Sequence, residues 1–539
     1  MTKNRWSNLN RIAAWGIAAL LLFGTGSFAA DVPLVEAAKN RNPAAVRALL
    51  GQNADVNAAQ GDGATALAWA AHWGDTETAE LLIQAGADVN RANDYGVTPL
   101  SLACTRGNPD LIRMLLDAGA DPNVARKTGE TPLMTCARTG SVEAVKLLLE
   151  RGADANAKES RRGQTALMWA AAQKHSEVAA VLMAHGADPN AVSHRPDGFA
   201  PVQYLTYGVY YRDPSGPDNF GPNDVHPDPA SSRGGFTALM FAARQGDIDS
   251  ARLLLEAGAD INYSSPEYGS ALVIAVASSQ EEFARFLAER GADPNSTDRW
   301  GFAPLHYALR DGITAIGMSR ERIPTDSYWL RPSMPGLVES LLEHGADPNI
   351  RVGNGFPPFD YPPFGRTTGN SMPRIRQPGA TPFLLAAASF DVSLMQLLIE
   401  HGADPMLATS EGTTPLMVAA GLGRLEDLTD EEEQKALQAA RFALEQGNDV
   451  NSANQDGRTA LAAAAFLGAN RLVQLFADHG ADLEAPDRYG QTALSIARGL
   501  PPKVPGRDKR FYTASPHPET AELLLRLGAK PLEVSPSER

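Results

Sequence analysis

A three-residue motif, Gly-Ala-Asp, returns along the chain at a nearly constant distance. It begins at Gly86, Gly119, Gly152, Gly186, Gly258, Gly291, Gly345, Gly402 and Gly480. The first three copies are 33 residues apart, and the same distance of 33 separates Gly258 from Gly291. Self-similarity at a fixed period of about 20 to 50 residues indicates a repeat architecture. A repeat array also suits a chain of 539 residues, because each unit contacts only its neighbours and no single core limits the length.

A second motif, Thr-Pro/Ala-Leu-x-x-Ala, keeps step with the first. It begins at Thr65, Thr98, Thr131, Thr165, Thr237, Thr414, Thr459 and Thr492, with variants at Ser270, Ala303 and Thr381. Thr is a good helix N-cap, and Pro suits the first helical position because its missing N–H has no helical partner there. A second apolar run at helical spacing follows, as in Leu111, Ile112, Leu115 and Leu116. It ends at the Gly of Gly-Ala-Asp, which can adopt the left-handed C′ conformation, so each unit predicts helix–turn–helix.

The period and both motifs resemble the ankyrin repeat. The resemblance covers most of residues 30–534 and implies an all-α solenoid of about 12–13 helix–turn–helix repeats with short hairpin tips, followed by a tail at 535–539. Capping units are expected at both ends, around residues 34–50 and 519–527. The family's His, which ties adjacent loops by hydrogen bonds, is present only as His306. Met occupies that place at Met134, Met168, Met240 and Met417. We therefore expect packing to replace part of its role.

The first 29 residues have the layout of a secretory signal peptide. Three bases precede an apolar run from Ile12 to Phe23, and small residues follow up to Ala29. The run is shorter than the roughly 20 residues that a spanning helix needs. We expect cleavage after Ala29 and a periplasmic or secreted protein. An uncleaved N-terminal anchor is the alternative.

Charge and cysteine content limit the partners and crosslinks. The chain has a net charge of −15, and removal of the leader leaves 45 bases against 63 acids, a net −18. This field repels phosphate, so we expect no nucleic acid partner. After signal removal no segment is apolar enough to span a membrane. A bridge between Cys104 and Cys136 is conceivable, but the two residues are one place out of step in the motif and replace small Ala residues. We interpret them as small buried apolar residues.

Five insertions interrupt the period, at about 191–235, 313–335, 350–379, 422–437 and 499–518. The first and third are rich in proline and aromatic residues. Aromatic side chains held by prolines offer contact area at low entropic cost, which favours a recognition surface. Loops that fold back over exposed helix ends are the alternative interpretation.

No pattern of a catalytic or cofactor site is present, and we expect neither an enzyme nor a cofactor. Four histidines share the place before Gly-Ala-Asp, where capping of a helix C-terminus explains them: His185, His344, His401 and His479. An acidic group in the first insertion could bind a cation, although its spacing fits no known site: Asp218, Asp224, His226 and Asp228.

The ends of the first helices and the hairpin tips carry an excess of Arg and aromatic residues, which anchor interfaces. The candidate protein-binding residues are His72, Trp73, Tyr95, Arg106, Arg138, Gln173, Arg244, Gln245, Trp300, Arg310 and Tyr489. In the fold implied by the resemblance they face a concave groove. The sequence thus predicts a monomeric scaffold that binds a protein partner, such as an acidic segment. Two alternatives stay open: an enzyme or metal protein with its site in the 191–235 and 350–379 insertions, and a self-assembling envelope protein.

Overall fold

The computed structural model describes residues 32–194, 234–317, 332–353, 378–424, 427–500 and 515–531. Within them 25 α-helices form twelve pairs, with α16 as an additional helix. The chain divides into two compact units, residues 1–188 and 189–539. The all-α repeat architecture expected from the sequence is confirmed. The predicted signal peptide and the interiors of most insertions lie outside the described residues. No helix in the described ranges is both long and apolar enough to cross a membrane.

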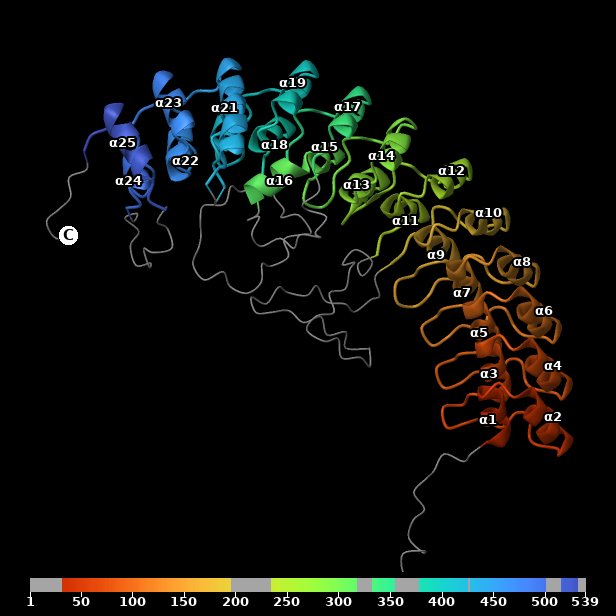
Figure 1. Cartoon of the computed structure of the whole chain (residues 1–539). Coiled ribbons are helices and arrows are strands. Elements are labelled where there is room, and N and C mark those ends of the chain that lie inside the picture. Colours follow the sequence, from red (N-terminus) through yellow and green to blue (C-terminus); the bar gives the residue numbers. More distant parts are fainter. Residues whose placement is uncertain are drawn as a thin grey trace, which may run out of the picture. The chain divides into compact units, whose positions relative to one another are not determined.

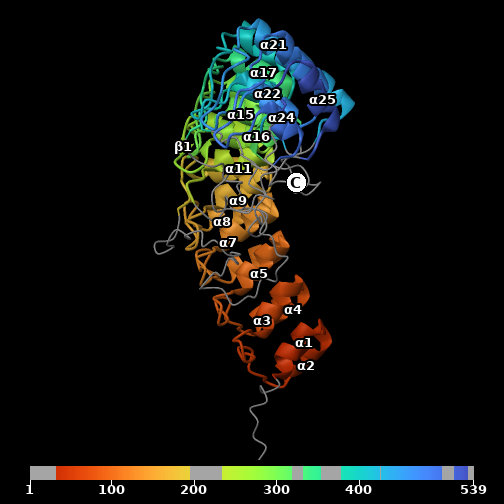
Figure 2. The same ribbon diagram turned by 90° about the vertical axis from the view of Figure 1, so that its left-hand side faces the viewer.

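The first unit contains five helix pairs. The first helices are α1 (Pro33–Lys39), α3 (Ala66–Trp73), α5 (Pro99–Arg106), α7 (Pro132–Thr139) and α9 (Ala166–Ala172). The second helices are α2 (Pro43–Gly51), α4 (Thr76–Gln84), α6 (Pro109–Asp117), α8 (Val142–Glu150) and α10 (Ser176–Ala184). First and second helices form two layers, and the hairpin loops project from the first-helix layer (Figure 1). The turned view in Figure 2 shows the first helices of this unit one above another in chain order, from α1 upward to α9.

The second unit contains seven pairs. The first helices are α11 (Ala238–Gln245), α13 (Ala271–Ala277), α15 (Pro304–Ala308), α18 (Pro382–Ala388), α20 (Pro415–Ala419), α22 (Ala460–Phe466) and α24 (Ala493–Ala497). The second helices are α12 (Ile248–Glu256), α14 (Glu281–Ala288), α17 (Pro335–Glu343), α19 (Val392–Glu400), α21 (Asp430–Glu445), α23 (Asn470–Asp478) and α25 (Pro518–Arg526). Helix α16 (Arg310–Gly317) follows α15 and packs on α18. One hairpin tip forms a two-stranded sheet, in which β1 (Ser264–Ser265) pairs antiparallel with β2 (Gly269–Ser270).

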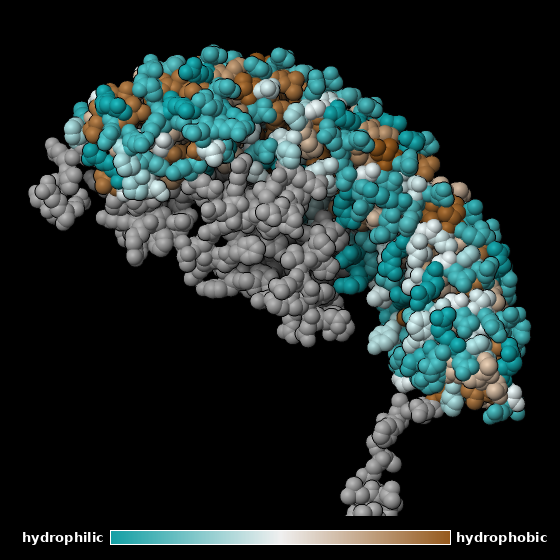
Figure 3. Space-filling model, in the orientation of Figure 1, coloured by the Kyte–Doolittle hydropathy of each residue, from teal (hydrophilic) through white to brown (hydrophobic). Residues whose placement is uncertain are grey.

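Local chemistry sets the helix boundaries as the motifs predict. The hydroxyl of Thr65 accepts a hydrogen bond of 3.3 Å from the backbone N–H of Ala68 and so caps α3. Helix α3 ends at Gly74, whose φ of 69° lies in the left-handed region. Ala66 and Ala70 on this helix are fully buried, because small side chains let neighbouring first helices approach closely. The visible surface is mostly hydrophilic, with separate hydrophobic patches (Figure 3).

A ladder of asparagines joins most of the neighbouring repeats. The side chain of Asn90 accepts from the backbone N–H of Asp121 at 2.8 Å and donates to the carbonyl of Gly119 at 3.0 Å. The same pair of bonds is made by Asn57, Asn123, Asn156, Asn190, Asn262, Asn295, Asn349 and Asn451. The bonds satisfy backbone groups in the nine loops that carry such an asparagine, so the ladder fixes the register between the repeats that it joins.

The ladder continues across three of the insertions. Asn190 precedes the first insertion, yet its side chain bonds to Gly258 and Asp260, which are 68 and 70 residues further on. The ends of this insertion also pair, because the backbone N–H of Ser193 donates to the carbonyl of Phe236 at 2.9 Å. The two described ends of this insertion therefore lie side by side within the second unit.

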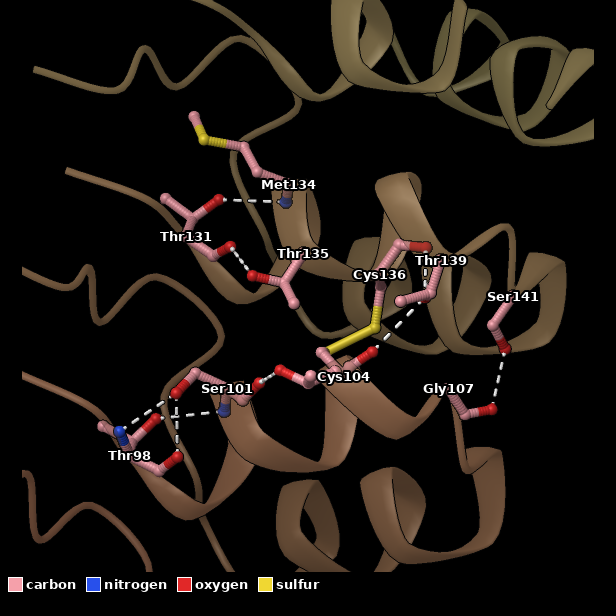
Figure 4. The surroundings of a disulfide bond; sticks show 11 residues. Thr98, Ser101, Cys104, Gly107, Thr131, Met134, Thr135, Cys136, Thr139 and Ser141 are labelled. Atoms are coloured by element: carbon pink, nitrogen blue, oxygen red, sulfur yellow. Dashed lines mark hydrogen bonds between the residues drawn. A yellow bond between two sulfur atoms is a disulfide. The ribbon is translucent and has the colours of Figure 1, made fainter. Parts of the chain in front are cut away.

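Cys104 and Cys136 form a disulfide between α5 and α7, so the expectation of two unlinked cysteines was wrong. Both residues are fully buried, and their Cα atoms are 4.7 Å apart (Figure 4). Within the motif the two cysteines differ by one place. Neighbouring helices do not have to pair equal motif positions, and a separation of 32 residues places these two side by side.

His306 bridges two loops, as the resemblance implies. Its Nδ1 accepts from the backbone N–H of Ala303 at 3.0 Å, and its Nε2 donates to the carbonyl of Ile350 at 3.1 Å. Burial lowers the pKa of His306 to about 4, so the side chain is neutral near pH 7. The methionines at the equivalent places, Met134, Met168, Met240 and Met417, are buried and fill this space by packing.

Candidate protein-binding surface

One row of residues runs along the ends of the first helices in the first unit. It consists of the three residues before the N-cap of each second helix, in the triplets 39–41, 72–74, 105–107, 138–140 and 172–174. We call this the helix-end row. Four of its five triplets carry at least one exposed base, and none carries an acid: Lys39, Arg41, Arg106, Arg138 and Lys174. The remaining triplet carries His72 and Trp73 instead. A chain with a net charge of −15 therefore holds here a row that has bases in four of its five triplets and no acid.

Hydrogen bonds between repeats hold Trp73 and Arg106 in place. The indole Nε1 of Trp73 donates to the carbonyl of Lys39 at 3.0 Å. The Nε of Arg106 donates to the carbonyl of His72 at 2.7 Å, and its guanidinium lies 5.9 Å from the Trp73 ring. The Trp73 side chain is still 37% exposed. The row therefore presents an indole and a guanidinium whose positions are fixed before any partner binds.

The same arrangement continues at Arg138. Its guanidinium lies 5.1 Å over the ring of Trp169 in the next repeat, a favourable cation–π geometry. Its backbone carbonyl accepts from His175 Nε2 at 3.1 Å. Carbonyls at a helix end have no helical partner, so a donor from the following repeat satisfies them. Polar side chains near the helix ends thus also have a structural role, because they satisfy the free carbonyls of the neighbouring repeat. The sequence did not predict this role.

Arg310 does not belong to the exposed surface, contrary to the sequence analysis. It is only 1% exposed, and its guanidinium donates to the carbonyl of Ala277 at 2.8 Å and to the Ser279 hydroxyl at 2.7 Å. The cause is the short helix α15, which ends at Ala308 so that α16 starts at Arg310 itself. The chain direction changes at this point and turns the side chain into the second unit.

The indole of Trp300 is also withdrawn from the surface, being 9% exposed. Its backbone N–H donates to the Asp298 carboxylate at 2.9 Å, and the Arg299 guanidinium lies 5.0 Å over its ring. Burial raises the pKa of Asp298, which accepts a hydrogen bond of 2.7 Å from the Tyr307 hydroxyl. Trp300 and Asp298 thus form a packed polar cluster beneath the tip and not an exposed anchor.

The other candidates fall into two groups. Tyr95, 68% exposed at a tip, and Gln173 belong to the first unit together with His72, Trp73, Arg106 and Arg138. Arg244, Gln245 and Tyr489 are half-buried residues of the second unit. Tip-to-tip backbone bonds, such as that from the N–H of Lys127 to the carbonyl of Tyr95 at 3.2 Å, join the tips into one edge. The first unit therefore holds six of the candidates, five near first-helix ends and Tyr95 at a tip.

The histidines before Gly-Ala-Asp cap helices, as predicted. The Nδ1 of His185 donates to the Val181 carbonyl at 2.9 Å, and equivalent bonds are made by His344, His401 and His479. Among the described residues no group of three or more His, Cys, Asp or Glu side chains could hold a metal ion. The acidic group Asp218, Asp224, His226 and Asp228 lies outside those residues.

Comparisons with known proteins agree with the architecture. The pattern of the family described as Ankyrin repeats (3 copies) matches residues 34–126, 118–193, 239–317 and 432–504, together more than half of the chain. A protein of Escherichia coli (strain K12) named as an ankyrin repeat protein, YahD, is 28% identical over 34% of this chain and 89% of its own length.

Two longer relatives match larger parts of the chain. The ankyrin repeat and KH domain-containing protein mask-1 of Caenorhabditis elegans is 33% identical over 55% of this chain, but over only 10% of its own length. A Danio rerio protein named as a palmitoyltransferase, ZDHHC13, is 26% identical over 56% of this chain and 37% of its own length. This chain thus spans less than two fifths of either protein, so the likeness concerns the repeats.

Proposed function

The chain belongs to the ankyrin repeat family, and from this premise we propose that it is an exported, non-enzymatic scaffold that binds a protein partner. Ankyrin repeats generally mediate protein–protein interaction. The helix-end row is the observation that carries the proposal. It combines exposed bases with the fixed, partly exposed indole of Trp73, the residue types that anchor protein interfaces. The tip residue Tyr95 extends the contact surface beyond the row.

The partner would present an acidic segment to this row. The first unit offers bases and no acids at the row positions, whereas the whole chain is acidic with a net charge of −15. A local field of opposite sign steers an acidic protein to one face and discourages binding elsewhere. The overall negative charge argues against a nucleic acid partner.

Two observations support export. The first is the leader-like segment that ends at Ala29. The second is the disulfide between Cys104 and Cys136, because disulfides persist in oxidising compartments such as the periplasm and the extracellular space. We propose a periplasmic or secreted location on these grounds.

Crosslinking in the native compartment tests the binding function. The variant Arg106→Glu/Arg138→Glu reverses two charges of the row. The matched control Arg113→Glu/Lys146→Glu reverses two exposed charges on α6 and α8, the second helices of the same two repeats. We expect the row variant to lose the crosslinked partner and the control to keep it. Equal crosslinking by both variants would refute the row as the binding surface.

A further inference from the structure

The helix-end row presents its residue types in a fixed order along the first unit. Read from α1 to α9, its triplets contribute Lys39 with Arg41, then His72 with Trp73, then Arg106, Arg138 and Lys174. The order is base, indole, base, base, base. A partner that fits the row would therefore present its groups in the matching order of acid, apolar, acid, acid and acid.

The spacing of the row sets the spacing of these groups. Successive first helices pack about 8–10 Å apart, and the row contributes one triplet per repeat. A polyproline II segment has three residues per turn and advances about 3.1 Å per residue, so every third side chain lies on the same face, about 9 Å from the one before it. Such a segment lying along the row would thus place every third side chain over successive triplets. An α-helix advances only about 1.5 Å per residue and would need six or seven residues per step.

Two positions of the row carry bases where the backbone favours glycine. In the middle three triplets the last residue is Gly74, Gly107 and Gly140, with φ values of 69°, 66° and 79°. At the same place Arg41 has a φ of 55° and Lys174 a φ of 61°. A residue that carries a side chain is less stable than glycine in this left-handed backbone conformation. Within the part of the chain that the structure describes, the side chains of Arg41 and Lys174 make neither a hydrogen bond nor an ion pair. Their charge is the property that glycine would lack.

We propose that the helix-end row binds an acidic protein segment in the polyproline II conformation, in which every third residue is Asp or Glu, except the one opposite Trp73, which is apolar. This inference rests on the proposed function and specifies the partner at the same surface. Trp73 would contact the apolar residue. Arg106, in the following repeat, is already oriented by its hydrogen bond to the His72 carbonyl. Arg138 is oriented in the same way by its position over Trp169.

Fluorescence anisotropy with a labelled synthetic peptide tests the pattern. The probe is Glu-Ser-Gly-Leu-Ser-Gly-Glu-Ser-Gly-Glu-Ser-Gly-Glu, made in this order and in reverse because the row does not fix the chain direction. A peptide of the same composition with its four Glu residues adjacent is the control. We expect the purified full chain to bind one of the two patterned peptides at least about tenfold more tightly than the control peptide. Equal binding of the patterned and the control peptide would overturn the spacing.

Variants separate the row from the general charge of the protein. Arg106→Glu/Arg138→Glu should weaken binding about tenfold or more, while Arg113→Glu/Lys146→Glu should leave it unchanged. Lys174→Gly is a variant that should still fold. It removes a base and places glycine at a position whose backbone is left-handed. It should weaken binding about threefold while raising the Tm. Unchanged binding by Lys174→Gly with a raised Tm would contradict the role of this base.

The remaining outcomes separate this inference from the proposed function. Heparin or single-stranded DNA that binds the row more tightly than the patterned peptides would show a polyanion site and overturn the assignment to a protein segment. Failure of both patterned peptides to bind, with the native crosslink still lost in Arg106→Glu/Arg138→Glu, would overturn only the partner chemistry. Failure of both peptides together with an intact crosslink would overturn the proposed function as well.

Discussion

Replacing Cys104 and Cys136 together by alanine should lower the free energy of unfolding by about 4 kcal/mol. The disulfide joins residues 32 positions apart. A crosslink that closes a loop of this length reduces the entropy of the unfolded chain by about 12 cal/mol/K, which corresponds to about 4 kcal/mol at 25 °C. Alanine fits the site because both cysteines are fully buried at places where other repeats carry small residues.

The native contacts around the bridge do not depend on the sulfur atoms. The Thr139 hydroxyl lies 3.3 Å from the Cys104 carbonyl and 3.0 Å from the Cys136 carbonyl. These acceptors belong to the backbone and remain in the alanine variant (Figure 4). The change in stability therefore reports mainly the loss of the crosslink.

Equilibrium urea unfolding followed by circular dichroism measures the effect. The oxidised protein should have the highest midpoint, while the double variant and the protein in dithiothreitol should share a lower one. The single variant Cys104→Ala is the control, and it should match the double variant because one cysteine alone forms no bridge. Identical midpoints with and without reductant, or two reactive thiols in the denatured but unreduced protein, would refute the reasoning.

Four further predictions follow from single positions. Burial lowers the pKa of His306 to about 4, so below its unfolded value of about 6.5 only the unfolded chain takes up the proton. The free energy of unfolding should therefore fall by about 3 kcal/mol between pH 7 and pH 4, and this fall should be absent in His306→Gln. Asn123→Ala removes two ladder bonds and should cost about 1–3 kcal/mol in urea unfolding. Met406 stands at a ladder place, so Met406→Asn should raise the stability by about 1 kcal/mol. Mass spectrometry of the exported protein should find an N-terminus after Ala29; an intact leader would refute cleavage.

Much of the fold could be predicted because each helix boundary has a local cause. Thr at the N-cap, Pro after it and Gly at the C-terminus act within one turn of the chain, so the motifs alone predict the helix pairs. The asparagine ladder has a signal in the sequence, because Asn stands two places after the Asp of Gly-Ala-Asp in nine repeats or variants, such as Asn90 and Asn451. Its role becomes visible only when adjacent repeats are placed side by side.

The errors arose where three-dimensional proximity differs from motif position. Cys104 and Cys136 were compared within the repeat frame, although the distance between neighbouring helices decides whether they meet. Arg310 was assigned to the surface by its motif place, but an insertion starts there and α16 redirects the chain. Trp300 was assigned by its place at a tip, and the buried Asp298 beneath it had no counterpart in the motif. In the first unit, where no insertion intervenes, Trp73, Arg106 and Arg138 lie near the C-terminal ends of first helices, as the repeat frame predicts, and their role in binding stays a prediction.

The central claim is that the repeats display the helix-end row to a partner. Hydrogen–deuterium exchange tests this most directly when the full chain is measured with and without the partner recovered by crosslinking. The account predicts slower exchange at the C-terminal ends of α3, α5, α7 and α9 and at the tip around Tyr95, with unchanged exchange in α6 and α8. Protection confined to the second helices, with no change along the row, would contradict it.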